Sequence, residues 1–267
     1  MRRRTTPVAL AALLVSLIAL ATAAVTSASL SPASASFTLR AGDATLGTAT
    51  EAKVVGVPTN PPKADIEIAI DTTGSMQSTI NDAKADANAI VSGVNSLGAD
   101  TQYAIVQFKD FCTDTAPTSG PGCTLLGGSV YPGDYPEYQV VQPLTSSATD
   151  VSNALNTLSA DGGGDAPEAY NLVFHNSYSD PSIGWRAGTR KFVIVIGDAQ
   201  PHGNVAAQGF AGCSDVTVDP HSLVTSTELA GMAANERTLM MIRQVSGATT
   251  TSLACYQSLA AAGFTGG

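Results

Sequence analysis

From residue 63 onward, the sequence alternates between short, almost fully apolar runs and longer amphipathic stretches. Four of the runs are nearly continuous in apolar residues, which is typical of strands in a parallel sheet that is covered on both faces. These runs are residues 66–70, 103–108, 192–196 and 238–242. A fifth run, residues 138–144, is more polar and is predicted to form an edge or hairpin strand.

The stretches between the apolar runs carry helical periodicity. The clearest covers residues 76–97, in which Met76, Ile80, Ala83, Ala87, Ile90, Val94 and Leu97 recur at steps of three and four. Shorter helices are predicted at 151–158, 167–175, 223–234 and 255–262. This alternation predicts an α/β fold: a doubly wound, mostly parallel sheet with one antiparallel edge strand and helices on both faces.

The N-terminus has the three-part pattern of a secretory signal. Arg2, Arg3 and Arg4 precede an apolar run over residues 8–25, and the small-residue segment after it ends Ala33-Ser34-Ala35. Cleavage after Ala35 is the favoured interpretation, with a signal peptide at residues 1–35, because an A-x-A site follows the apolar run. The alternative is an uncleaved N-terminal membrane anchor, for which the run is at the lower length limit.

Residues 36–62 read as a linker or N-terminal extension, because they mix Thr, Ala, Gly and Pro and end in a proline-rich stretch. One strand near residues 53–57 is conceivable within it. The globular domain is predicted from residue 63 to residue 267. No other stretch is apolar and long enough to span a membrane, so no membrane insertion is expected after signal cleavage.

The charge balance limits the classes of partner. The chain has a net charge of −9, and cleavage of the signal would make it −12 by removing three arginines. A chain this acidic repels nucleic acid and anionic membranes and attracts cations.

Four cysteines, Cys112, Cys123, Cys213 and Cys255, are an even number, which in an exported chain suggests two disulfides. Three pairings are possible. A Pro/Gly/Thr-rich loop separates Cys112 from Cys123, so a local bridge there is the simplest choice, and Cys213 would then pair with Cys255. No C-x-x-C or other zinc-type spacing is present.

Three acidic loops follow the predicted strands: residues 71–75, 161–168 and 197–202. In a doubly wound sheet, ligands bind beyond the carboxyl ends of the strands, so these loops are expected at one edge. Converging carboxylates repel each other unless a cation lies between them. Carboxylate and hydroxyl oxygens suit Mg²⁺, Mn²⁺ or Ca²⁺.

The remaining chemistry-bearing side chains have plainer interpretations. His202 ends the third loop and is expected to be merely exposed, while His175 and His221 have no obvious partners in the sequence. Trp185 is expected to pack against the sheet. Asp71 alone could simply cap a helix.

At this point the sequence resembles a known family. Asp71-Thr72-Thr73-Gly74-Ser75 is similar to the D-x-S-x-S signature of von Willebrand factor type A domains, and Asp198 ends the strand that carries their second acid. The loop 165–168 and the sequence Ile-Gly-Trp-Arg at 183–186 narrow the resemblance to the type A domain of integrin β subunits and its bacterial secreted relatives. The resemblance covers residues 64–263.

The resemblance implies a metal-ion-dependent adhesion site (MIDAS). Thr73 and Ser75 would be hydroxyl ligands of Mg²⁺ or Mn²⁺, Glu168 a carboxylate ligand, and Asp71 and Asp198 would hold coordinated waters. An open coordination position would accept an acidic group of a partner. The resemblance also places a small disulfide loop at Cys112–Cys123, which is the expected partner-specificity loop.

A neighbouring Ca²⁺ site is implied at Asp110, Asp165 and Glu168, although Gly163 stands where the family has an amide-bearing residue. A third cation site is not expected, because Ser78 and Thr79 replace its two acids. The family adds a final strand after the last helix. Either the sequence is a fragment, or its type A domain has one strand fewer.

The sequence therefore predicts a secreted or cell-surface adhesion module that binds a carboxylate of a protein or glycoconjugate through a metal, and not an enzyme. One alternative is a metal-assisted, phosphatase-like hydrolase, although no G-x-S-x-G elbow or Asp-x-Asp pair supports it. The other is a structural module of a larger surface protein.

Overall fold

A computed structural model describes residues 29–31, 54–56, 63–111, 136–163, 167–245 and 251–263 of the chain. Its main element is a five-stranded sheet in the order β5-β4-β3-β7-β9. The strands are β3 (Lys63–Asp71), β4 (Asp100–Phe108), β5 (Tyr138–Thr145), β7 (Arg190–Gly197) and β9 (Arg237–Arg243).

The pairing of these strands matches the predicted sheet. Strand β3 lies at the centre and pairs in parallel with β4 and β7, and β7 pairs in parallel with β9. The edge strand β5 is antiparallel to β4. The predicted fold class, a doubly wound α/β sheet with one antiparallel edge, is therefore confirmed.

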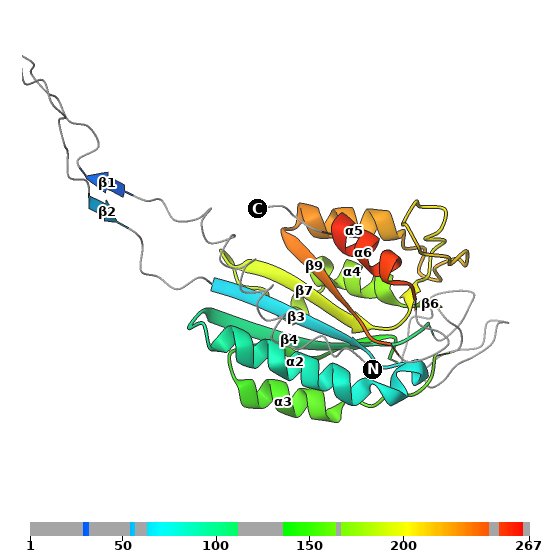
Figure 1. The fold of residues 1–267 in the computed structure, drawn as a ribbon, viewed down its shortest axis with the longest axis horizontal. Helices are drawn as coiled ribbons and strands as arrows, with labels where there is room; N and C mark the ends of the chain where they lie inside the picture. The colour runs from blue at the N-terminus through cyan, green and yellow to red at the C-terminus, as the bar shows by residue number, and fades with distance from the viewer. Residues whose placement is uncertain are drawn as a thin grey trace, which may run out of the picture.

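Helices cover both faces of the sheet (Figure 1). On one side lie α2 (Ile80–Asn95) and α3 (Ala148–Thr157), and on the other lie α4 (Tyr170–Ser179), α5 (Thr225–Ala234) and α6 (Leu253–Ala262). Because successive strand residues point to opposite faces, β3 contributes to both cores. Ile66, Ile68 and Ile70 pack towards α2, whereas Ala69 packs towards α4.

Two helix starts differ from the prediction. The first helical stretch opens with a 3-10 turn, η1 (Gly74–Ser78), before α2 begins at Ile80. Residues 167 and 168 are not helical: they form a short strand, β6 (Pro167–Glu168), which pairs in parallel with β8 (Gln200–Pro201). This pairing joins two of the acidic loops, so the loops have a backbone connection of their own.

Outside the main sheet, β1 (Ser29–Ser31) pairs antiparallel with β2 (Val54–Gly56). Strand β2 lies within residues 53–57, where the sequence indicates a strand. A second 3-10 turn, η3 (Pro181–Ile183), follows α4. Within the described ranges, no helix has the length and apolar character needed to cross a membrane. The apolar run at 8–25 and its cleavage site lie outside the described residues.

The family-like sequence around Trp185 and Arg186 is structural. Arg186 Nε donates to Asp65 Oδ1 at 2.7 Å and Arg186 Nη1 donates to Asp100 Oδ1 at 2.8 Å. Asp65 is fully buried in β3, and Asp100 starts β4. Trp185 packs against the α4 side of the core as expected, and the Arg237 guanidinium lies 4.9 Å from its ring centroid. These contacts fix the amino-terminal edge of the sheet, opposite the acidic loops.

Candidate metal site

The turn after β3 is organised by the side chain of Asp71. Its Oδ1 accepts hydrogen bonds from the backbone N–H of Thr73 at 2.9 Å and from the Thr73 hydroxyl at 2.7 Å. Thr73 Oγ1 and Ser75 Oγ lie 3.2 Å apart. The D-x-T-x-S spacing therefore places a carboxylate and two hydroxyl oxygens next to each other on one turn.

Asp198, at the end of β7, completes this row of oxygens. The Ser75 hydroxyl donates to Asp198 Oδ1 at 2.9 Å, across 123 positions of sequence. The backbone of Asp198 is also held, because its carbonyl accepts from the N–H of Thr251 at 2.7 Å. The structure thus brings oxygens of Asp71, Thr73, Ser75 and Asp198 into one row of close contacts.

The glycine-rich loop brings Glu168 to the same place. The N–H of Gly74 donates to the carbonyl of Gly162 at 2.8 Å, and a Cβ on Gly74 would lie only 2.6 Å from that oxygen, so the close approach requires glycine. A Cβ on Gly163 would lie 3.0 Å from Thr73 Cβ and 3.5 Å from Glu168 Oε1. Thr73 and Glu168 therefore border the same point, and all five predicted ligands come together.

Burial gives this site unusual electrostatics. Asp71 is fully buried, and desolvation raises the pKa of its carboxyl to about 7. Desolvation also raises the pKa of Asp198. In addition, Asp71 Oδ2 is buried and has no hydrogen-bond partner among the described residues. A cation bound here would stabilise the ionised carboxylates.

The donor set is mixed. Within the described part of the chain, no three carboxylate, imidazole or thiol side chains form a metal-binding group. The candidate site depends instead on hydroxyls combined with carboxylates, all of them oxygen donors, which is the chemistry preferred by Mg²⁺ and Mn²⁺.

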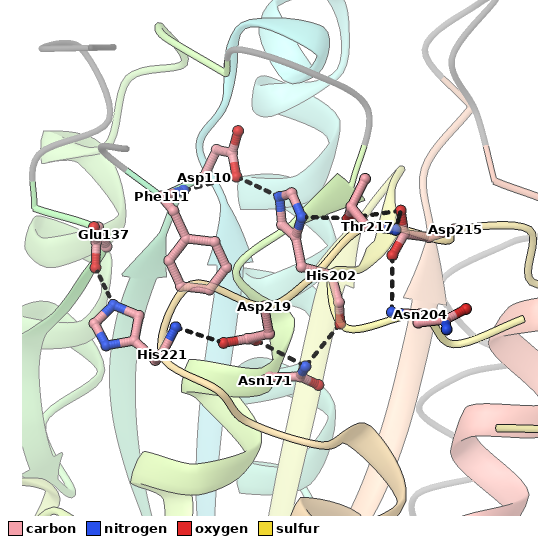
Figure 2. Close-up of polar contacts among 10 residues, drawn as sticks. All are labelled: Asp110, Phe111, Glu137, Asn171, His202, Asn204, Asp215, Thr217, Asp219 and His221. Carbon is pink, nitrogen blue, oxygen red and sulfur yellow. Dashed lines mark hydrogen bonds and ion pairs between the residues drawn. The ribbon is translucent and has the colours of Figure 1, made fainter. Parts of the chain in front are cut away.

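The structure describes only Asp110 and Glu168 of the three residues expected at the second site. Asp110 Oδ1 accepts from the backbone N–H of Phe111 at 2.7 Å and lies 2.8 Å from His202 Nε2 (Figure 2). Asp165, its expected companion, lies outside the described residues. The carboxylate of Asp110 thus faces an imidazole in this structure, and the neighbouring Ca²⁺ site stays a prediction.

The expectation that His202 is merely exposed was wrong, and all three histidines contact side chains far away in the sequence. His202 is only 6% exposed and contacts Asp110 and Thr217 (Figure 2). His221 Nε2 lies 2.7 Å from a Glu137 carboxylate oxygen, which raises the pKa of the imidazole, and His175 Nδ1 lies 2.9 Å from Glu228. Each carboxylate partner is at least 53 positions away in the sequence, so local patterns could not identify these pairs.

Lys109 is a further residue that the sequence analysis missed. Its ammonium is largely buried, pairs with the Asp161 carboxylate and donates to the Asp161 carbonyl at 3.1 Å. Lys109 also accepts a hydrogen bond at its carbonyl from the N–H of Ala169. This lysine fastens the glycine-rich loop beside Glu168. Its position directly after an apolar strand was the only available signal.

The structure contains the predicted disulfide between Cys213 and Cys255, which ties α6 to the long segment between β8 and α5. Cys112 and Cys123, and with them the expected specificity loop, lie outside the described residues.

Comparisons with known proteins concern the fold. No protein-family model and no curated protein sequence matches this chain. Among solved structures, the conserved hypothetical protein BatB from Bacteroides thetaiotaomicron is 13% identical, with 75% of this chain and 86% of that chain covered and a TM-score of 0.46. The SpRpn10 VWA domain is 12% identical, with 75% and 82% covered and a TM-score of 0.44.

The fold assignment rests on the sheet itself. Three acidic loops meet at one edge of a mostly parallel sheet, beside a single antiparallel edge strand, as the resemblance to type A domains implies. The narrower likeness to integrin β subunits rests on the loop motifs alone. The globular part of this chain has a von Willebrand factor A-like fold.

Proposed function

We propose that this protein is a metal-dependent ligand-binding module, in which a divalent cation of the Mg²⁺ type is held at the edge of the sheet and binds an acidic group of a partner. The observation that carries the proposal is the row of neighbouring oxygens from Asp71 through Thr73 and Ser75 to Asp198, together with the buried, unpartnered Asp71 Oδ2.

The directions of the hydrogen bonds suit a cation. The Thr73 hydroxyl donates its proton to Asp71 and the Ser75 hydroxyl donates to Asp198. Each hydroxyl oxygen is thereby polarised, and its lone pairs are available on the side away from the carboxylate. Thr73, Ser75 and Glu168 would hold the cation directly, and Asp71 and Asp198 would act through the hydroxyls and through water.

Because few protein charges would touch the cation directly, a partner's carboxylate would be needed to complete its coordination. Only Glu168 would contribute a full negative charge in direct contact, because the charges of Asp71 and Asp198 act from one layer further out. The bound cation would supply a Lewis-acidic position for a carboxylate oxygen. The proposed activity is binding of the partner's carboxylate without turnover.

The partner is proposed to be a protein or glycoconjugate outside the cell, as for the integrin β domains that the motifs resemble. The disulfide between Cys213 and Cys255 supports an oxidising compartment, where such bonds persist. Ca²⁺ at a neighbouring site, involving Asp110 and Asp165, belongs to the same proposal.

The test is calorimetric titration of Mg²⁺ into the EDTA-stripped chain, compared with Asp71→Ala and Ser75→Ala. Saturable binding is expected for the wild type, and a loss of affinity of at least about tenfold for each variant, because each removes one link of the oxygen row. Asp82→Ala, which removes an exposed carboxylate on α2, is the matched control and should bind as the wild type does.

Repeating the titration with acetate present tests whether a carboxylate completes the coordination of the cation. Tighter Mg²⁺ binding in acetate is expected if a carboxylate completes the coordination. Unchanged binding in both Asp71→Ala and Ser75→Ala, with or without acetate, would refute the proposed site.

A further inference from the structure

Residues 214–219 have an inverted pattern of polar and apolar side chains. Val216 and Val218 are 73% and 77% exposed, whereas Asp215 and Asp219 are 5% and 2% exposed. A surface segment normally turns its apolar residues inward and its carboxylates outward. Here the two carboxylates are buried, and the two valines face the solvent.

The inner side of this segment is firmly attached. Asp215 Oδ1 accepts from the N–H of Thr217 at 3.0 Å and from its hydroxyl at 2.8 Å, and Asp215 Oδ2 accepts from the N–H of Asn204 at 3.2 Å. Asp219 Oδ2 accepts from the buried amide of Asn171 at 2.9 Å (Figure 2). The exposure of the two valines is therefore imposed by the hydrogen bonds that hold Asp215 and Asp219 inward.

The main-chain hydrogen-bonding groups at the two valines are also available to a ligand. The N–H of Asp215 donates to Gln200 Oε1 at 3.2 Å, and its carbonyl accepts from the N–H of Ala206 at 3.1 Å. Within the described part of the chain, the N–H and C=O groups of Val216 and Val218 have no protein partner. An extended peptide can satisfy such groups by strand addition, with its apolar side chains against the valines.

This surface is continuous with the candidate metal site. Gln200, which holds the segment, lies two positions after Asp198. His202 contacts Thr217 through Nδ1, and its N–H donates to the carbonyl of Glu168 at 3.3 Å. Gln200 and His202 therefore join this segment to the loops that carry Asp198 and Glu168.

We propose that residues 214–219 dock an extended segment of a partner protein, which covers Val216 and Val218 with apolar side chains and bonds to their main chain. The inference deepens the proposed function and rests on it for the partner's carboxylate, which would occupy the adjacent metal edge. A second copy of the chain is a poorer occupant, because the net charge of −9 makes two copies repel each other.

The test uses a random dodecapeptide library displayed on phage and selected against the full chain in Mg²⁺. The expected result is enrichment of peptides that carry an acidic residue near alternating aliphatic or aromatic residues. Synthetic peptides from the selection should bind Val216→Ser/Val218→Ser at least tenfold more weakly, while the Mg²⁺ affinity of that variant stays unchanged. Leu97→Ser, which replaces an exposed apolar residue at the other end of the sheet, is the control and should bind normally.

The outcomes separate this inference from the proposed function. If Mg²⁺ binds but no peptide depends on the two valines, the docking surface is refuted and the metal site stands. If Mg²⁺ does not bind and peptides still depend on the valines, the metal site is refuted and the docking surface stands. A concentration-dependent dimer that the double substitution abolishes would replace the peptide with a second copy and overturn the inference.

Discussion

Among single residues, Glu67 is placed most unfavourably for a charge. It lies in the central strand β3, is fully buried, and neither carboxylate oxygen has a hydrogen-bond partner among the described residues. Desolvation raises its pKa to about 8, and the attraction of Arg237 only partly opposes this. The carboxyl group is therefore neutral in the folded chain under conditions in which it is ionised in the unfolded chain.

Glu67 should make the domain less stable as the pH rises. Between its unfolded value of 4.5 and the folded value of about 8, the folded state binds more protons than the unfolded state, so the free energy of unfolding falls with pH. The slope from this one group approaches about 1.4 kcal/mol per pH unit. Glu67→Gln should remove that part of the slope when urea unfolding is compared at about pH 5 and about pH 8, in EDTA, because the amide does not titrate.

The pKa of Asp71 is also raised. Asp71 is present in both the wild type and Glu67→Gln, so its effect on the pH slope cancels when the two proteins are compared. Parallel pH profiles for wild type and Glu67→Gln would show that Glu67 is ionised in the folded state, contrary to the expectation.

At the residue scale, the sequence predicted the local part of the site and missed the distant pairs. Asp71, Thr73 and Ser75 belong to one turn, so their spacing already determines their contacts. The pairing of His202 with Asp110 depends on how two loops 92 positions apart meet, and no local pattern encodes that.

At the scale of elements, the site depends on close approach between β7 and α4. A Cβ on Gly197 would lie 2.2 Å from the Tyr170 hydroxyl and 2.9 Å from Asp71 Cβ. Tyr170 is fully buried, and its hydroxyl lies 2.6 Å from that of Tyr256 on α6. Helices α4 and α6 therefore meet directly beneath Asp71, where there is no room for an extra methyl group.

Gly197→Ala should lower the free energy of unfolding by about 1–3 kcal/mol through overpacking. Tyr170→Phe removes the nearest clashing atom. Gly197→Ala should therefore cost less stability when it is made in the Tyr170→Phe background than when it is made in the wild type. Denaturant unfolding of the four proteins in a double-mutant cycle measures this. Strict additivity would mean that the tyrosine does not contact residue 197.

The disulfide is the second device that joins elements. Cys213 and Cys255 are separated by 42 positions, and closing a loop of that length is worth about 4 kcal/mol in the chain-entropy model. Cys213→Ser/Cys255→Ser should lose stability of that order in urea unfolding. A loss near zero would show that the segment before α5 is held by its polar network alone.

Element types were largely predictable, but their ends were not. The predicted helix over 167–175 begins only at Tyr170, because Pro167 and Glu168 are drawn into a two-residue pairing with Gln200 and Pro201. That pairing is tertiary, and it overrides the local helical pattern.

At the scale of the whole molecule, the parallel strands and their loops explain why the site forms where it does. Parallel strands β3 and β7 end at the same edge, and this places Asp71 and Asp198 close together despite their separation in sequence. The fold class could be predicted because apolar runs alternate with helical stretches along the sequence. The docking surface at Val216 and Val218 could not, because its pattern is the reverse of the usual one.

The proposed cation is held by Thr73, Ser75 and Glu168, with Asp71 and Asp198 behind them. A crystal structure of the chain soaked in Mn²⁺, with anomalous difference maps, would locate it. We expect a peak bordered by the Thr73 and Ser75 hydroxyls and the Glu168 carboxylate, and no such peak in Asp71→Ala. A fully occupied Mn²⁺ elsewhere, with this edge empty, would contradict it.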